Sequence, residues 1–295
     1  MLDRLLGKYM LEKQLITKEQ LGHVFRVQEN NRAKLGVIAV SEKLITIAQA
    51  EQVNALQASM DMRFGDIAIE KGYLTQAQLN RLLELQGNSY LTFVQAIVDE
   101  NFLSMEQVNK VEADYQSELG LTATNMMELK SDDIDRIVPI FLEDSDKQLQ
   151  GMFAMGVKAM YRLVDNHVYI GKAFKTTSIR GEVFGYQKFH GDENATVAIC
   201  GKYEDIQKVA ISYTKEEFIE TEEDALDAVC EFINCINGLY ATEQSKSGQK
   251  IELEPPEFSV SYTEARGEGI TVLPVYISGG EVAFMVAGSN NIEIV

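Results

Sequence analysis

A carboxylate and a carboxamide stand three residues apart in the second half of this chain. They are Glu231 and Asn234, within the run 224–238, which reads Asp-Ala-Leu-Asp-Ala-Val-Cys-Glu-Phe-Ile-Asn-Cys-Ile-Asn-Gly. If the run is helical, residues three apart are neighbours on one face, so both side chains point the same way into solvent. Such a pair can grip a partner through the carboxylate and hold one water molecule through the amide. No other arrangement in the sequence suits chemistry as well.

The spacing of apolar residues predicts that this run is an amphipathic helix. The apolar residues recur at spacings of three and four, and the opposite stripe is polar. The apolar stripe holds Leu226, Val229, Ile233 and Ile236, and the polar stripe holds Asp227, Glu231, Asn234 and Gly238. Thr221, followed three residues later by Asp224, is a capping signature, and the acids at 222–224 suit the positive end of the helix dipole.

The elements around this helix predict an α+β domain. A helix is expected from Gln148, with apolar residues at Leu149, Phe153, Val157, Met160 and Leu163. A second helix is expected at 205–213, and Gly267-Glu-Gly269 predicts a turn. Strands are expected near 168–176, 182–189, 195–203, 258–263, 270–277 and 282–287. Helices packed on one face of a largely antiparallel sheet would bury these patterns.

The first third of the chain repeats with a period of 29 residues. The residues at one equivalent position of the four copies, here called the reference position, are Gly7, Gly36, Gly65 and Val94. Each copy predicts a short helix, a tight turn, and a second helix that ends near Gln28, Gln57, Gln86 or Gln116. The second helices should start at Thr17, Thr46, Thr75 and Ser104, each with a Gln three residues on to complete a capping box. One helix pair cannot bury its apolar face alone, so we expect neighbouring copies to stack, with the divergent fourth copy as a terminal cap.

Length and composition favour a soluble protein of two domains. We expect an all-α helical-repeat domain at 1–118, a linker at 119–145 and the α+β domain at 146–295. A net charge of −18 argues against nucleic acid or an anionic membrane as the main partner. The 3 cysteines show neither metal-ligand spacing nor a disulfide framework, and the sequence has no signal peptide or membrane span. We therefore expect a cytoplasmic protein without membrane insertion.

The repeat resembles the N-terminal module of type II secretion and pilus assembly ATPases, over roughly residues 4–116. The pattern of that module is Arg-Leu-Gly, two apolar residues, Gly-Leu-Ile and an apolar helix ending in Gln. Some of its members bind cyclic di-GMP through the Arg-Leu-Gly turn, but only the third copy here keeps the arginine, as Arg63-Phe64-Gly65. Leu5 and Lys34 stand at that place in the first two copies. We therefore expect a docking or oligomerisation platform and no tight binding of cyclic di-GMP.

The second domain resembles the CheX branch of the CheC/CheX/FliY chemotaxis phosphatases, over about residues 146–291. The signature of that family is Glu-x-x-Asn on a long helix, a Gly four residues later, and Pro-Pro before a strand. Here these are Glu231, Asn234, Gly238 and Pro255-Pro256. The first helix of the domain holds no Glu-x-x-Asn, so one site is expected, as in CheX.

The resemblance implies a protein aspartyl-phosphate phosphatase that acts on a response-regulator receiver domain. Asn234 would then position water, and Glu231 would pair with the active-site lysine typical of receivers. No cofactor or metal of its own is implied, because the receiver carries its own Mg²⁺. We also expect a homodimer. Two alternatives remain open: a catalytically silent receiver-binding adaptor, and a cyclic di-GMP-responsive regulator of motility, pilus or secretion assembly.

Overall fold

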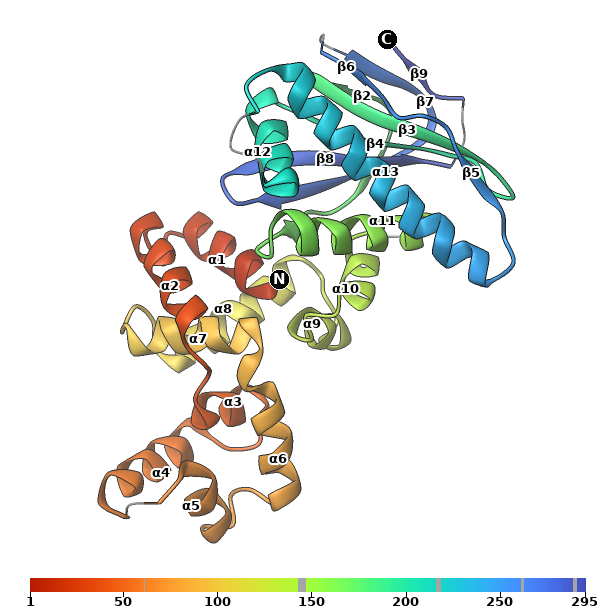
Figure 1. Cartoon of the computed structure of the whole chain (residues 1–295). Helices are drawn as coiled ribbons and strands as arrows, with labels where there is room; N and C mark the ends of the chain where they lie inside the picture. The colour runs from red at the N-terminus through yellow and green to blue at the C-terminus, as the bar shows by residue number, and fades with distance from the viewer. Residues whose placement is uncertain (61, 143–146, 216–218, 261–262, 289–290) are drawn as a thin grey trace. The chain divides into compact units, whose positions relative to one another are not determined.

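The chain folds into two compact units, Met1–Asp132 and Asp133–Val295. The computed structural model describes residues 1–60, 62–142, 147–215, 219–260, 263–288 and 291–295. Unit 1 is all helical and unit 2 combines helices with an antiparallel sheet, which confirms the predicted fold class (Figure 1). The stretch expected to connect them holds two helices, α9 (Ala123–Lys130) in unit 1 and α10 (Ile134–Phe141) in unit 2. Within the described ranges, no helix is both long enough and apolar enough to cross a membrane.

Each copy of the 29-residue repeat forms a helix, a turn and a second helix. In chain order these are α1 (Leu2–Glu12), α2 (Lys18–Asn30), α3 (Leu35–Ser41), α4 (Ile47–Met60), α5 (Phe64–Glu70), α6 (Gln76–Glu84) with the 3₁₀ turn η1 (Leu85–Gly87), α7 (Ser89–Asp99) and α8 (Met105–Glu118). The turns repeat as well, since Gln14, Lys43, Gly72 and Asn101 all adopt left-handed backbone with φ between 56° and 70°. In each copy a helix, a left-handed turn and a second helix follow one another.

All four predicted capping boxes form. The backbone N–H of each cap residue donates to the side chain of the Gln three residues on, at 2.7 or 2.8 Å. The cap hydroxyl in turn accepts from the backbone N–H of that Gln. These bonds satisfy backbone donors that the first turn of a helix leaves without partners. The second helix of every copy therefore starts where the sequence predicts.

The glycines at the reference position let helices approach closely. A Cβ added at Gly7 would lie 2.9 Å from the side chain of Leu21, and one at Gly65 would lie 2.7 Å from that of Leu79. Each of these leucines belongs to the second helix of the same copy. Arg63-Phe64-Gly65 is therefore the start of α5 and not a turn, and packing inside unit 1 accounts for its glycine.

The expected stacking of neighbouring copies is wrong in one respect, because the fourth copy is not a terminal cap. Its first helix, α7, packs against α1, α2 and α3, and α1 also packs against α8. Copy 1 thus pairs with copy 4, while copy 2 pairs with copy 3 through α3, α5 and α6. The reason is composition: α7 has Val94 where the other copies have a reference glycine, and it is buried along most of its length. A helix apolar on nearly all sides belongs inside a bundle.

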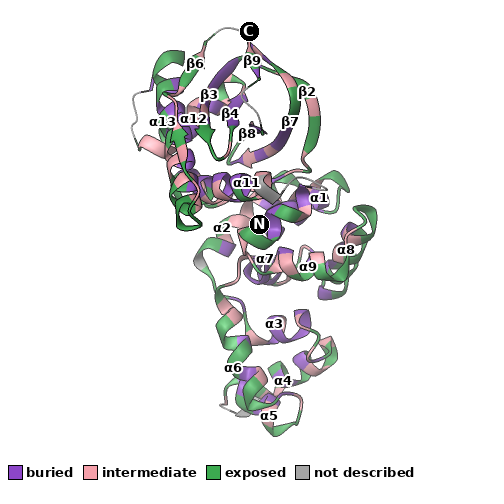
Figure 2. Ribbon diagram, turned by 90° about the vertical axis from the view of Figure 1, so that its right-hand side faces the viewer, coloured by how far each residue is buried: buried purple, intermediate pink, exposed green. Residues whose placement is uncertain are grey.

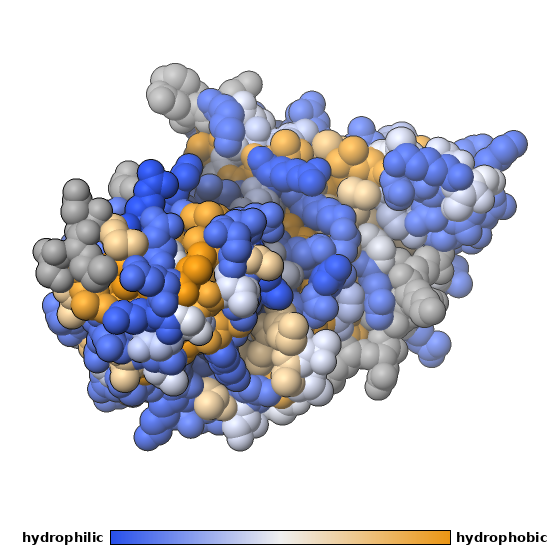
Figure 3. Space-filling view, turned by 90° about the horizontal axis from the view of Figure 1, so that it is seen from below, coloured by the Kyte–Doolittle hydropathy of each residue, from blue (hydrophilic) through white to orange (hydrophobic). Residues whose placement is uncertain are grey.

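Hydrophilic side chains cover most of the face seen in Figure 3, and apolar ones show between them. Several large apolar residues of unit 1 remain exposed, among them Leu83 (48%), Leu119 (55%) and Met127 (70%). Single exposed residues of this kind are ordinary on a folded protein.

Unit 2 is a curled antiparallel sheet with three helices on one face. The sheet strands are β1 (Tyr169–Ile170), β2 (Phe174–Gly181), β3 (Val183–Gly191), β4 (Ala195–Gly201), β5 (Ile251–Leu253), β6 (Glu257–Ser259), β7 (Thr263–Ile277), β8 (Gly280–Ala287) and β9 (Glu293–Ile294). They follow the order β1-β7-β8-β4-β3-β5, and β2 and β9 also pair with β7 while β6 pairs with β3. The helices are α11 (Lys147–Ala159), which continues into the π-helical turn η2 (Met160–Val164), α12 (Tyr203–Thr214) and α13 (Glu222–Lys246).

The two faces of this sheet bury different sets of side chains. α11, α12 and α13 cover the outer face, where α13 lies across β3, β4, β5 and β6 (Figure 1). The sheet curls around its other face, as the view along it shows (Figure 2). A second apolar cluster fills this concave side, including Phe184, Ile270, Val272 and Met285. Alternation along each strand sends neighbouring residues to opposite faces.

Two predictions in unit 2 are wrong, each for a local reason. Gly267-Glu-Gly269 is not a turn but lies inside β7, opposite a register shift in β2 where β7 carries extra residues. Gly269, with φ +75°, adopts the left-handed backbone that such a bulge requires. Leu163 was expected on the buried stripe of the first helix, yet it is exposed and Val164 is buried. The π-helical turn there adds residues to the turn and rotates the apolar face onward.

Gly156 of α11 has no side chain, and this leaves room for the ring of Phe284 between the helix and the sheet. A Cβ at this position would lie 2.1 Å from the Phe284 ring, which is fully buried and meets Phe153 edge-on. We predict that Gly156→Ala forces this ring out of place and destabilises unit 2 by about 1–3 kcal/mol, as overpacked cores do. Urea unfolding, followed by circular dichroism, measures the change.

Gly151 on the same helix is the matched control. A Cβ there would meet only the Tyr240 ring, at an ordinary 3.6 Å. Gly151→Ala should be neutral or stabilising, because alanine favours a helix interior over glycine by roughly 0.5–1 kcal/mol. Equal effects of the two substitutions would contradict the packing described for Gly156.

Candidate functional site

The helix α13 carries the candidate site, and its own sequence determines where it starts and which face it buries. Thr221 and Asp224 form the predicted capping box, with three acids in the first turn. The predicted apolar stripe is fully buried, at 0% exposure for Leu226, Val229, Ile233 and Ile236. Where α13 packs on β3, the strand has Gly185. A Cβ at this position would lie 3.3 Å from the side chain of Val229 and would press on the helix.

The polar stripe of α13 faces solvent as predicted. Asp227, Glu231 and Asn234 are exposed, and Gly238 is half-buried. Glu231 makes no hydrogen bond or ion pair with any residue that the structure describes. Tyr213 of α12 lies nearby: burial raises the pKa of its phenol, and the charges of Cys235 and Glu231 raise it further. The carboxylate of Glu231 is therefore available to a partner.

Asn234 differs from Glu231 because a buried side chain holds its amide. Gln187, in the middle of β3, is 1% exposed and donates from Nε2 to Asn234 Oδ1 at 2.8 Å. The same nitrogen donates to the backbone carbonyl oxygen of Glu254 at 2.7 Å. Gln187 Oε1 accepts from Nδ2 of the fully buried Asn237 at 2.8 Å. The buried amide of Gln187 thus connects β3 and the segment after β5 to the exposed stripe of α13.

The partner groups determine the orientation of all three amides. A backbone carbonyl oxygen can only accept, so the Gln187 atom that faces Glu254 must be the nitrogen. The Asn234 atom that faces this nitrogen must then be the oxygen, and Asn237 must present its nitrogen to Gln187 Oε1. Asn234 consequently turns its oxygen toward the network, and its Nδ2 makes no hydrogen bond to a described residue.

The Pro-Pro segment explains why the Glu254 carbonyl is available. β5 pairs with residues 189–191 of β3 and β6 pairs with residues 184–186, so the pairing is interrupted beside Gln187. Pro255 and Pro256 stand in that gap, and proline has no N–H to continue a ladder. The residue before a proline stays extended. The carbonyl of Glu254 therefore bonds to a side chain in place of a strand.

Sequence reasoning missed Gln187 and Asn237, although a signal existed for the first. Val183, Gly185, Gln187 and Phe189 alternate along β3 and are all buried. A glutamine in such an apolar register must find hydrogen-bond partners inside the protein. Asn237 gave no comparable signal, because its position on α13 lies at the border between the polar and apolar stripes.

The thiols beside the stripe are packing groups. Cys230 is buried, its Sγ donates to the carbonyl oxygen of Glu257 at 3.3 Å, and burial raises its pKa to about 12. Cys235 is half-buried. Among the residues that the structure describes, no group of three or more His, Cys, Asp and Glu side chains could hold a metal ion.

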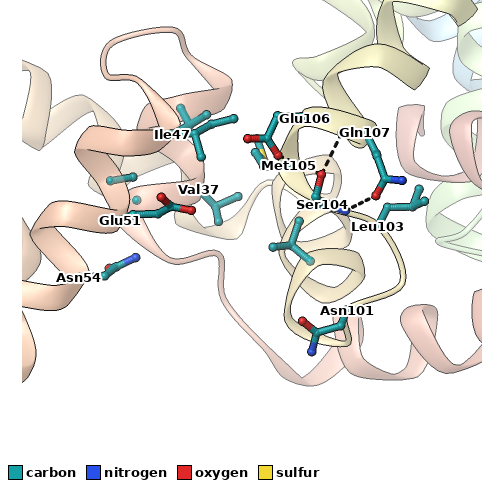
Figure 4. Close-up of a pocket in the computed structure, with 14 residues that line it drawn as sticks. Val37, Ile47, Glu51, Asn54, Asn101, Leu103, Ser104, Met105, Glu106 and Gln107 are labelled. Atoms are coloured by element: carbon teal, nitrogen blue, oxygen red, sulfur yellow. Dashed lines mark hydrogen bonds between the residues drawn. The ribbon is translucent and has the colours of Figure 1, made fainter.

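Unit 1 has a pocket of its own, with a volume of about 470 Å³. Val37 and Ile47 lie on one side of it, and Leu103 and Met105 lie on the other (Figure 4). Its polar residues include Glu51 and Glu106, and no Lys or Arg is among the residues that line it. Two carboxylates without a cation suit a phosphate ligand poorly.

The arginine of the repeat motif lies elsewhere. Arg63 is exposed at the N-cap of α5 and does not line this pocket. Lys34, which stands at the same place in the second copy, is paired with Asp99 at 2.7 Å. The copies therefore do not bring several cations to the pocket, as a ligand with two phosphates would require.

One family model matches the chain, over the part that holds the α13 site. It is described as "Chemotaxis phosphatase CheX" and covers residues 183–264. This segment runs from the start of β3 through α12 and α13 to the first residues of β7, so it includes Gln187, Glu231, Asn234 and Pro255-Pro256. No curated protein matches the chain significantly.

Several solved structures are similar to about half of the chain. A chemotaxis protein CheX from Desulfovibrio desulfuricans is 14% identical and has a TM-score of 0.43, over 50% of this chain and 100% of that one. CheX from Vibrio vulnificus is 15% identical, with a TM-score of 0.40, over 50% and 100%. A CheX–CheY–BeF₃–Mg²⁺ complex from Borrelia burgdorferi is 18% identical, with a TM-score of 0.40, over 50% and 97%.

Proposed function

We propose that unit 2 dephosphorylates the aspartyl phosphate of a response-regulator receiver domain, in chemotaxis or two-component signalling. The observation that carries the proposal is the exposed amide of Asn234, held from below by Gln187 at 2.8 Å. It lies one helical turn from the exposed carboxylate of Glu231. Both residues fall within the segment that matches the family model of the chemotaxis phosphatase CheX, 183–264.

The reaction needs little from the protein beyond placing one water molecule. An aspartyl phosphate is an acyl phosphate with a good leaving group. Water oxygen bonds to phosphorus, the bond between phosphorus and the aspartyl oxygen breaks, and inorganic phosphate leaves with the carboxylate restored. Positioning and electrostatic stabilisation supply most of the catalysis in phosphoryl transfer.

Asn234 is suited to position that water. Water that attacks phosphorus with a lone pair directs its hydrogens toward acceptors. The carbonyl oxygen of an asparagine has two lone pairs. Gln187 occupies one of those of Asn234, and the other can accept from water. The outward Nδ2 can donate to a phosphoryl oxygen, and a neutral amide adds no negative charge beside the phosphoryl group.

Glu231 is proposed to bind the partner. Its carboxylate is exposed, has no partner among the described residues, and lies on the same stripe as Asn234. A receiver lysine could pair with it and set the helix over the phosphorylated aspartate. The metal ion of the reaction, Mg²⁺, would come bound to the receiver, so unit 2 would need no cofactor of its own.

We predict that Asn234→Ala lowers kcat for phospho-receiver dephosphorylation by roughly a hundredfold, because the attacking water loses its acceptor. The fold should persist, since the side chain is exposed. The assay incubates the full chain with a panel of receiver domains phosphorylated by acetyl phosphate and follows loss of the phosphoryl group. Activity equal to that of the natural chain would exclude α13 as the site. A natural chain that binds receivers but never accelerates hydrolysis would identify a silent adaptor.

For Glu231→Ala we predict a different outcome, with weaker binding as the main effect. Loss of the carboxylate should raise the Kd for a receiver carrying BeF₃⁻ and Mg²⁺ by roughly tenfold, because one charge-assisted hydrogen bond contributes about that much to affinity. Calorimetry measures the Kd. Glu243→Ala is the matched control, because Glu243 is exposed on the same helix but pairs with Lys246. Unchanged Kd together with a lost kcat would contradict this division of roles.

A further inference from the structure

We propose that Gln187 is a positioning residue that fixes the amide of Asn234, with its oxygen toward the sheet and its nitrogen toward the partner. The use of this orientation in catalysis rests on the function proposed above, but the orientation itself does not. Gln187 touches neither substrate nor water in this arrangement and acts through Asn234.

Three groups in different directions hold the side chain of Gln187 in place. Its nitrogen donates to Asn234 and to the Glu254 carbonyl, and its oxygen accepts from Asn237. A buried side chain with three bonds at 2.7–2.8 Å cannot turn without breaking several of them. By contrast, an exposed asparagine without such a partner would sample several orientations of its amide.

The hydrogen-bond network of Gln187 is retained at a cost to the stability of the fold. Asn237 is fully buried, and its Oδ1 has no hydrogen-bond partner among the described residues. An unsatisfied buried acceptor destabilises a fold, and apolar side chains of similar shape at both Gln187 and Asn237 would avoid the loss. Stability alone does not explain the buried pair of Gln187 and Asn237, whereas holding the amide of Asn234 does.

The test compares Gln187→Met, which keeps the shape and removes the hydrogen bonds, with the natural chain. We expect kcat to fall about tenfold while the Kd for the BeF₃⁻–Mg²⁺ receiver stays within about twofold. Nuclear magnetic resonance of the Asn234 side-chain NH₂ should show lower order in the variant, with no receiver present. Thr196→Val is the control for lost stability, since Thr196 is a fully buried polar residue of β4 outside this network.

The two readouts separate this inference from the proposed function. If the natural chain dephosphorylates no receiver, the function fails, and the order of the Asn234 amide still decides the inference. An Asn234 amide that stays equally ordered in Gln187→Met overturns it. So does a loss of kcat that is matched by Thr196→Val or by an equal loss of affinity.

Gly238 carries a second inference, from an independent observation. It lies inside a 25-residue helix, one turn beyond Asn234, and a Cβ there would meet nothing within 4 Å. Glycine weakens a helix interior relative to alanine. Packing within unit 2 therefore gives no reason for a glycine, unlike Gly156 and Gly185, whose missing side chains make room for neighbours.

We infer that Gly238 keeps the surface beside Asn234 low so that a receiver domain can approach the helix backbone closely. This inference also rests on docking of the receiver on α13. It predicts that one substitution increases stability and decreases affinity. Gly238→Ala should raise Tm by about 2 °C and weaken binding of the BeF₃⁻–Mg²⁺ receiver. Gly238→Leu should weaken binding further, because the added volume is larger.

Glu243→Leu is the control for a bulky apolar residue elsewhere on the exposed helix, and it should leave the Kd unchanged. A Tm that does not rise in Gly238→Ala overturns the inference whether or not any receiver binds. A raised Tm with unchanged affinity for a receiver that does bind also overturns it. A raised Tm in a chain that binds no receiver leaves the glycine without a structural role and rejects the receiver as its partner.

Discussion

The amide nitrogen of Gln187 donates two hydrogen bonds, and the geometry of the candidate site depends on the fact that one of them ends on a backbone carbonyl. A carbonyl cannot donate, so the bond to Glu254 determines which end of Gln187 faces which neighbour. The orientation of the Gln187 amide then determines the orientation of the Asn234 and Asn237 amides, each through one hydrogen bond. An exposed side chain on a helix thereby acquires a defined orientation from the sheet beneath it.

Three separate features of the chain are needed to put this bond in place. Pro255 and Pro256 interrupt the strand that would otherwise occupy the Glu254 carbonyl. Gly185 lets α13 approach β3 closely enough for side chains to reach across. The capping box at Thr221 starts α13 at a residue that turns its apolar stripe to the sheet. Each feature is local in sequence, but their effects meet at one amide.

The repeats of unit 1 illustrate the same relation between local and long-range determinants. Every capping box and every left-handed turn falls where the 29-residue period places it, because each depends on residues three or four apart. The order of packing does not follow the period. Copy 1 pairs with copy 4 because α7 is apolar on nearly all sides and must be enclosed. Small departures from the repeat in one copy thus decide the arrangement of all four.

The sequence by itself determined the elements and the exposed stripe of α13, since helix caps, apolar spacing and strand alternation are encoded by near neighbours. It predicted Glu231 and Asn234 as exposed neighbours on one face, and this is how they lie. Only the tertiary structure decided what lies under Asn234, because Gln187 is 47 residues away and Glu254 lies in the segment between β5 and β6. It also decided that Gly267 and Gly269 form a bulge, since a glycine pair suits a bulge and a turn equally until a paired strand is present. Hydrogen bonds between distant segments depend on how the chain packs, which local spacing does not specify.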